Sequence, residues 1–403
     1  MDKSTTPSES HGCINTSGNS FFSLLGPLLI LASIFFINFV SRIILAPLTP
    51  RIETDLNLTH ADAGTLFFTI SLGYFITLIG SGFVSSRFNH QRTILISNTA
   101  LGLALIGTSF CTGLWSMRLG LFALGMATGL YLPSGIATLM SIIPMHHWGK
   151  ALAIHELAPN LSFVAAPLIC EAVMIWFSWR TVFLIIGFVA LIMSPVFMGY
   201  RRGEQLMGEA PSFASFRQLF GNLSVWIMVL LFSLGVISTM GIYIMLPLYL
   251  VTDHAIDRNL ANTLIALSRI TGVIMAFVGG WATDRIGPRQ TLRIVLLVTG
   301  LLTFFLGIAP RSLILYIVFL QPLVAVCFFP AGFAAMSLVV SAKLRNIAVS
   351  FIIPLAIVIG AGLAPVFIGW IGDMGSFAIG ITICGGLIIV GSISTGLLKF
   401  HDQ

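Results

Sequence analysis

The chain has 403 residues, of which 57% are hydrophobic and only 8% are charged, and its mean hydropathy is +1.01. Soluble domains carry roughly 25% charged residues, so this composition excludes a water-soluble fold and indicates an integral membrane protein. The formal net charge of +6 arises mostly from loops on one side of the predicted spans. It therefore indicates topology, with both termini cytoplasmic, and gives no reason to expect a nucleic-acid partner.

Twelve apolar segments are each long enough to cross a bilayer as a helix. Residues 1–20 are polar and unpatterned, which predicts a disordered cytoplasmic tail. A first bundle over 21–200 is predicted to contain helices at 22–48, 63–85, 93–113, 116–144, 149–174 and 180–200. A polar cytoplasmic linker over 201–222 follows. A second bundle over 223–398 is predicted to contain helices at 223–251, 259–283, 291–309, 312–341, 346–371 and 375–398, before a short tail over 399–403.

The two sets of helices repeat each other at an offset of about 198 residues. The repeated elements are Gly82-Phe-Val-Ser-Ser86-Arg87 with Gly280-Trp-Ala-Thr-Asp284-Arg285, Leu132-Pro133 with Phe329-Pro330, Ala166-Pro167 with Ala364-Pro365, and Gly187 with Gly385. Membrane proteins built from repeated bundles keep their site between the repeats. The predicted fold is therefore an all-α membrane protein of 12 transmembrane helices in two pseudo-symmetric six-helix bundles.

The loops after the second and eighth predicted helices carry a recognisable pattern. The stretch from Gly280 to Arg289 fits G-x-x-x-D-R-x-G-x-R, whereas the first-half copy has Ser86 in place of the acid. On these residues the chain resembles the major facilitator superfamily over nearly its whole length. The resemblance implies alternating access without a cofactor or metal, and gating by Gly82, Arg87, Gly280, Asp284, Arg285, Gly287 and Arg289.

Asp284 has two interpretations. It could pair with a cation or a helix N-terminus of the other bundle and hold the cytoplasmic side shut. Alternatively, Arg285 and Arg289 determine topology, and Asp284 merely offsets their charge.

Arg42 is the only charge inside the first predicted helix, eight residues before Pro50. Organic-anion members of the superfamily place a similar arginine there, so the resemblance implies that Arg42 binds the anionic group of a substrate. The planar fork of a guanidinium suits carboxylate, to which it donates two parallel hydrogen bonds. The alternative is an arginine that extends to the membrane surface.

Arg269 lies about ten residues into the eighth predicted helix, at a depth comparable to that of Arg42. Two cations could therefore bind one anion. The alternative is a structural ion pair between Arg269 and an acid of the fifth helix.

Other polar residues within the predicted helices are further candidates. His155, Glu156 and Glu171 on the fifth helix are predicted to couple transport to protons or to form interhelical ion pairs. The remaining candidate substrate contacts are Tyr74, Tyr131, Asn160, Tyr243 and Gln321.

These observations predict a multi-pass carrier of the cytoplasmic membrane that acts as a monomer on a small organic anion, most simply a carboxylate, with a proton as coupling ion. Enzyme signatures are absent from the sequence. One alternative is efflux of a hydrophobic or drug-like compound, although buried arginines would repel a cation. Another is a non-transporting sensor or assembly factor on the same fold.

Overall fold

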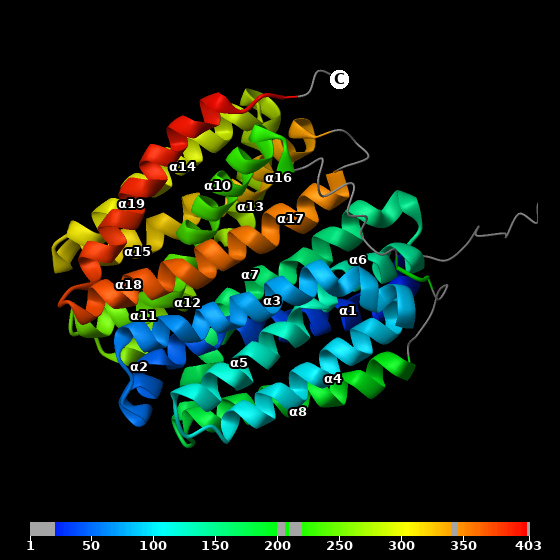
Figure 1. Cartoon of the computed structure of the whole chain (residues 1–403), viewed down its shortest axis with the longest axis horizontal. Coiled ribbons are helices and arrows are strands. Elements are labelled where there is room, and N and C mark those ends of the chain that lie inside the picture. Colours follow the sequence, from blue (N-terminus) through cyan, green and yellow to red (C-terminus); the bar gives the residue numbers. More distant parts are fainter. Residues whose placement is uncertain (1–20, 200–205, 209–219, 341–344, 401–403) are drawn as a thin grey trace, which may run out of the picture.

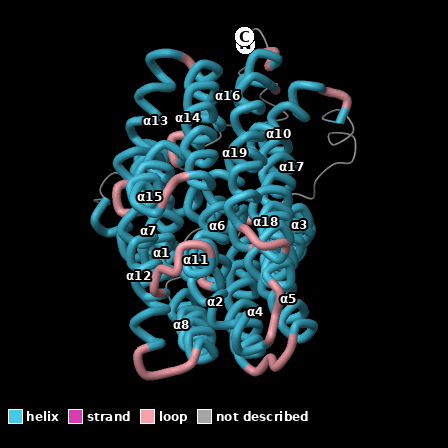
Figure 2. The backbone as a smooth tube through the Cα atoms, turned by 90° about the vertical axis from the view of Figure 1, so that its left-hand side faces the viewer, coloured by secondary structure: helices cyan, strands magenta, loops and turns pink. Residues whose placement is uncertain are grey.

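The computed structural model describes residues 21–199, 206–208, 220–340 and 345–400. Within these ranges every regular element is a helix, and 11 helices are long and apolar enough to cross a membrane. The helices run side by side, with the first half of the chain grouped on one side of the molecule and the second half on the other (Figures 1 and 2). The predicted tail 1–20, most of the linker 201–222 and residues 401–403 lie outside the described residues.

The first half makes six helical passes, two of which are divided into shorter helices. A break at Ile44 separates α1 (Phe21–Ile43) from α2 (Leu45–Leu56). The other elements are α3 (His60–Phe88), α4 (His90–Ser109), α5 (Leu114–Gly129) with α6 (Tyr131–Ile142), η1 (Met145–His147) with α7 (Trp148–Met174), and α8 (Trp179–Gly199).

The second half repeats this arrangement. Two of its passes contain a π-helical turn, η2 (Ile237–Gly241) between α10 (Leu223–Val236) and α11 (Ile242–Thr252), and η4 (Val358–Leu363) between α17 (Arg345–Ile357) and α18 (Ala364–Asp373). The other elements are α12 (Arg258–Arg269) with α13 (Gly272–Ile286), α14 (Pro288–Ile308), α15 (Arg311–Ala325) with α16 (Phe328–Val339), and α19 (Phe377–Ile393) with η5 (Ser394–Leu397).

The first pass is longer than the predicted range of 22–48. Its polar last turns carry Arg51, Glu53 and Asp55, so the apolar pattern stops before the helix does. The helix ends where Asn57 adopts a left-handed conformation with φ 52°, a conformation that commonly terminates helices.

Helix α4, which corresponds to the third predicted span (93–113), is not among the 11 apolar spans. It contains polar side chains that are buried against its neighbours: Ser97 donates to the carbonyl of Ala127 (2.7 Å), and Asn98 donates to that of Ala190 (2.6 Å). Hydrogen bonds between helices satisfy polar groups within a bilayer. They explain how a less apolar helix occupies this position.

Glycines at equivalent positions let helices approach closely in both halves. A Cβ on Gly102 of α4 would lie 2.8 Å from the carbonyl oxygen of Gly187 on α8. A Cβ on Gly300 of α14 would lie 3.2 Å from the carbonyl oxygen of Gly385 on α19. Small residues permit such backbone contact, so the repeated glycine seen in the sequence reflects a helix pair that recurs in each half.

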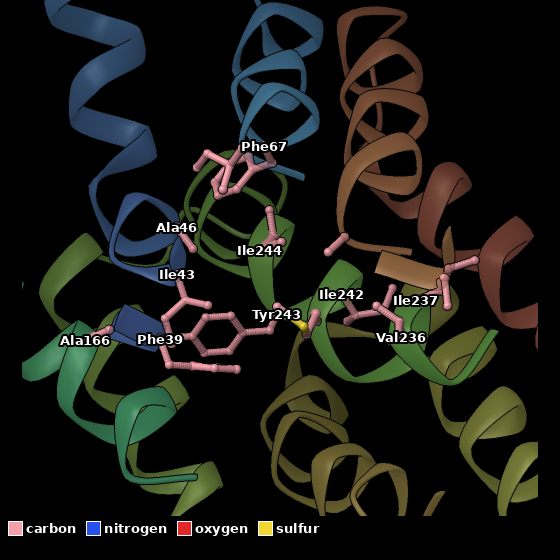
Figure 3. Close-up of a cluster of buried hydrophobic side chains, with 14 of the residues drawn as sticks. Phe39, Ile43, Ala46, Phe67, Ala166, Val236, Ile237, Ile242, Tyr243 and Ile244 are labelled. Atoms are coloured by element: carbon pink, nitrogen blue, oxygen red, sulfur yellow. The ribbon is translucent and has the colours of Figure 1, made fainter. Parts of the chain in front are cut away.

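The two halves are in contact at the end of the molecule that contains the loops 57–59, 253–257 and 374–376, here called the closed end. The Asp373 carboxylate of α18 accepts hydrogen bonds from the backbone N–H groups of His60 (2.8 Å) and Ala61 (2.9 Å) at the start of α3. Carboxylates are favoured at helix N-termini. Deeper in the molecule, Phe39, Ile43 and Ala46 of the first half face Tyr243 and Ile244 of the second (Figure 3).

Candidate functional site

A cavity of about 360 Å³ lies between the two halves. Its walls come from α1, α3, α6 and α7 of the first half and from α10, η2, α16 and α17 of the second. Leu132, Ile136, Phe333 and Val349 line its outer part. Leu132 and Ile136 belong to α6, which ends at Ile142, Phe333 to α16, which ends at Val339, and Val349 to α17, which begins at Arg345. These helix ends, together with the end of α13 at Ile286, are here called the open end. The cavity therefore extends from the middle of the molecule toward the open end.

Arg42 lies at the inner limit of this cavity, with only 8% of its surface exposed. It also lines a second cavity of about 20 Å³ on the closed-end side. Its guanidinium carbon is 4.6 Å from the ring centre of Phe39 and 4.4 Å from that of Tyr74, and its Nε has no hydrogen-bond partner. Among the described residues Arg42 forms no ion pair. The rings stabilise the cation without neutralising it.

Arg269 is held on the second half by different contacts. Its Nη2 donates to the carbonyl of Thr239 at 3.0 Å, and its guanidinium carbon is 4.9 Å from the ring centre of Phe163 and 5.0 Å from that of Tyr243. Phe163 packs edge-to-face on Phe39 (5.3 Å), so the two arginines lie against neighbouring rings. Arg269 is not among the residues that line the larger cavity.

The π-helical turns lie beside both arginines. Thr239 and Met240 of η2 line the larger cavity, and Ala361 of η4 lines the smaller one together with Arg42. A π-helical turn shifts the backbone hydrogen-bond register, and such turns occur frequently at functional sites. The carbonyl that accepts from Arg269 belongs to the η2 turn.

His155 is fully buried, and its neighbours determine which ring nitrogen carries hydrogen. The Tyr131 hydroxyl donates its hydrogen to the carbonyl of Leu31 (2.7 Å) and lies 3.1 Å from His155 Nε2. His155 Nε2 must therefore donate to the Tyr131 oxygen, which leaves Nδ1 facing Glu156 Oε1 at 3.5 Å. Glu156 is 56% exposed and lines the cavity.

Glu171 pairs with the other half at the closed end. Its Oε1 accepts from Arg258 Nη1 and from Asn262 Nδ2, each at 2.5 Å. The two acids of α7 thus have partners other than Arg269. Glu171 pairs with Arg258, and Glu156 lies beside His155. The proposed ion pair between Arg269 and one of these acids is absent from the described residues.

The remaining candidate substrate contacts divide into two groups. Tyr74 and Asn160 line the cavity. Tyr243 donates to the carbonyl of Phe163 (3.3 Å), Gln321 donates to that of Ser238 (2.7 Å), and Tyr131 contacts His155; these three lie outside the cavity lining.

Sequence reasoning missed the aromatic partners of the arginines. Phe39 stands three residues before Arg42, which places the two side chains on one helix face, and this spacing could have identified it. Phe163 carries no comparable local signal, because its partners are on other helices.

The residues of the signature loops lie at the open end. Asp284 is exposed at the end of α13 and belongs to no ion pair among the described residues. Arg285 lies over the Trp281 ring (5.4 Å), and Arg289 lies over the Phe400 ring (4.8 Å) and donates to the carbonyl of Leu398. Gly287 has φ 84°, a conformation that favours glycine. Gly82, Arg87 and Gly280 lie near the equivalent ends of α3 and α13.

Two similar helical bundles with a cavity between them are the architecture of many secondary transporters. The family model described as Major Facilitator Superfamily matches residues 31–256 and 236–402, and the chain belongs to that superfamily. This match confirms the family resemblance and the fold that the sequence predicts. The protein is a multi-pass membrane transporter and not an enzyme.

Curated relatives and solved structures agree with this assignment. The probable L-galactonate transporter of Escherichia coli is 25% identical over 388 residues, which cover 89% of this chain and 85% of that one. The probable sulfoacetate transporter of Cupriavidus necator is 22% identical over 310 residues, which cover 70% and 71%. Other relatives include a membrane sensor protein of Salmonella typhimurium. A bacterial homologue of the lysosomal transporter Spinster, in an inward-facing and occupied conformation, has a TM-score of 0.81 at 15% identity and covers 94% of this chain and 97% of its own.

Proposed function

We propose that the protein transports a small organic anion, with a carboxylate as the group that Arg42 binds. The observation that carries the proposal is a buried guanidinium at the inner limit of the cavity between the halves, without a carboxylate partner among the described residues. A charge in a bilayer interior is costly and usually marks a functional site. A substrate carboxylate would supply the missing partner, and hydrogen bonds to charged groups contribute about 1.5–3 kcal/mol.

The names of the relatives support an anionic substrate. Galactonate and sulfoacetate, which two of them are named for, are both organic anions. Their bodies differ, one being a polyhydroxy acid and the other a short sulfonate. The shared feature is an anionic group that an arginine can bind through two parallel hydrogen bonds.

Transport would occur by alternating access. The halves are joined at the closed end and separated by the cavity toward the open end, so rocking of one half against the other would expose Arg42 to each side in turn. In our proposal the open end is cytoplasmic, both termini lie in the cytoplasm, and the protein works as a monomer in the cytoplasmic membrane. The excess of Lys and Arg in the loops at this end supports that orientation.

A proton is the coupling ion in this proposal. The Glu156 carboxylate lines the cavity, and its Oε1 lies 3.5 Å from Nδ1 of His155, so these two groups can share one added proton. With the pair unprotonated, the negative charge of Glu156 would disfavour an anion in the same cavity. Protonation removes this repulsion, and by linkage the bound anion then favours the proton equally.

The experiment is a comparison of binding and transport. Purified wild-type protein should gain thermal stability from at least one of L-galactonate, sulfoacetate and benzoate, because a ligand stabilises the folded state by mass action. Arg42→Ala should abolish this gain, whereas a control at the exposed Arg311, Arg311→Ala, should retain it. Proteoliposomes should then take up the bound anion. An unchanged gain in Arg42→Ala would overturn the anion site, and binding without uptake would favour a sensor.

A further inference from the structure

The cavity between the halves is walled mainly by apolar side chains. Six phenylalanines contribute to it, and aliphatic side chains fill most of the remaining surface. The phenylalanines are Phe35, Phe39, Phe163, Phe232, Phe329 and Phe333. Some of these rings pack on one another across short distances, as Phe232 does on Phe333 at 5.6 Å. Rings from both halves therefore face the space next to Arg42.

Few polar groups in the lining are free to bind a hydroxyl. The neutral polar side chains are Tyr74, Asn160 and Thr239. Thr239 Oγ1 donates to the carbonyl of Gly235 (2.8 Å), and Asn160 Nδ2 donates to that of Glu156 (3.1 Å). Part of their hydrogen-bonding capacity is thus already used within their own helices.

The described part of the lining contains one cation. Among the residues that the structure describes, Arg42 is the only arginine or lysine of the lining, and Glu156 is the only acid. Arg269 is outside the lining and is bonded to the carbonyl of Thr239. A second negative charge on the substrate would therefore meet no second cation in this cavity and would face Glu156.

These features favour a substrate whose body, meaning the part attached to the carboxylate, is apolar or aromatic. Burying a hydroxyl without a hydrogen bond costs about 1–3 kcal/mol in proteins, and a polyhydroxy acid would bury several. An apolar ring would instead be favoured by burial and by contact with aromatic edges and faces.

We propose that the substrate is a monocarboxylate with an apolar or aromatic body, and that the phenylalanine cavity discriminates against polyhydroxy acids and dianions. Arg42 binds the carboxylate, and the rings of α1, α7, α10 and α16 enclose the body. This inference rests on the proposed function, because it requires that Arg42 bind an anion.

The test is a binding series on the purified full-length protein with benzoate, cyclohexanecarboxylate, L-galactonate, phthalate and benzyl alcohol. Benzoate and cyclohexanecarboxylate are expected to bind at least tenfold more tightly than L-galactonate, phthalate or benzyl alcohol. Binding of L-galactonate or phthalate in preference to benzoate would overturn the inference and leave the anion carrier intact. Preference for benzyl alcohol, or no binding by any carboxylate, would overturn the proposed function itself.

A pair of variants tests whether the rings act directly. Phe333 lines the cavity and is 44% exposed, so Phe333→Ala should fold, and it should weaken benzoate binding by roughly three- to tenfold. Phe277 is 72% exposed and lies outside the lining, so Phe277→Ala is the matched control and should bind as wild type does. Equal benzoate affinity in the two variants would overturn the part of the proposal in which the α16 ring of Phe333 encloses the body.

Discussion

Arg258 of α12 donates a hydrogen bond to Glu171 of α7, with Nη1 and Oε1 2.5 Å apart, and this ion pair joins the two halves of the transporter. The Glu171 side chain is 11% exposed and that of Arg258 is 28% exposed. Asn262 donates to the same oxygen. The pair stabilises the conformation in which the closed end is shut, and it must break if the halves separate there.

Glu171→Gln should favour opening of the closed end. The amide removes the ionic part of the contact, and a loss of about 1 kcal/mol, typical of a partly exposed pair, corresponds to roughly a fivefold shift in population. Maleimide labelling of Ile244→Cys, which lines the small cavity next to Arg42, should accelerate in an otherwise cysteine-free protein. Asp55→Asn breaks an ion pair with Arg180 within one half and should leave labelling unchanged.

Gly64 and Gly80 provide a matched pair of substitutions on one helix. A Cβ on Gly64 would lie 2.6 Å from the Pro365 carbonyl oxygen, whereas a Cβ on Gly80 would meet nothing within 4 Å. Gly64→Ala should therefore separate α3 from α18 and increase the same labelling several-fold, while Gly80→Ala should have no effect. Equal labelling of the two variants would argue that α3 and α18 do not control the closed end.

Arg42→Lys tests the geometry of the anion site. Lysine keeps the positive charge but loses the planar fork, so the affinity for a bound carboxylate should fall by about 10- to 100-fold, since each 1.4 kcal/mol changes affinity tenfold. Isothermal titration of the purified variant measures the change, and its melting temperature without ligand serves as the folding control. Wild-type affinity would show that Arg42 does not bind the carboxylate through its planar fork.

Glu156→Gln tests proton coupling. An inward proton gradient should drive uptake of the anion by the wild type, because a proton shared by His155 and Glu156 removes a negative charge from the cavity. In Glu156→Gln that charge is absent whether or not a proton is bound, so this coupling should disappear. Anion exchange across proteoliposomes should persist, while accumulation driven by an inward proton gradient should be lost. Continued proton-driven accumulation would place the coupling site elsewhere.

Asp284→Asn tests the gate at the open end. Asp284 is exposed here, without an ion pair among the described residues, which fits a contact that forms only when the open end closes. The variant should therefore favour the present conformation and increase labelling of Ile353→Cys, which lines the cavity. Unchanged labelling would leave Asp284 as a residue that only offsets neighbouring arginines.

The sequence by itself determined the membrane class, the repeated halves and the signature loops, and it singled out Arg42 as a candidate site residue. Each of these depends on local information: apolar length, spacing along the chain, or a charge where burial is costly. The predicted first helix stopped too early for the same reason, because its polar last turns give no apolar signal.

Only the tertiary structure decided which groups meet. Glu171 pairs with Arg258 rather than with Arg269, Phe163 of the fifth pass lies against Phe39 and Arg269, and the neighbours of His155 determine its tautomer. These contacts join helices far apart in the chain, and helix rotation, tilt and a π-helical turn determine them. Apolar periodicity does not fix these quantities, because in a bilayer the lipid-facing and core-facing sides of a helix are both apolar.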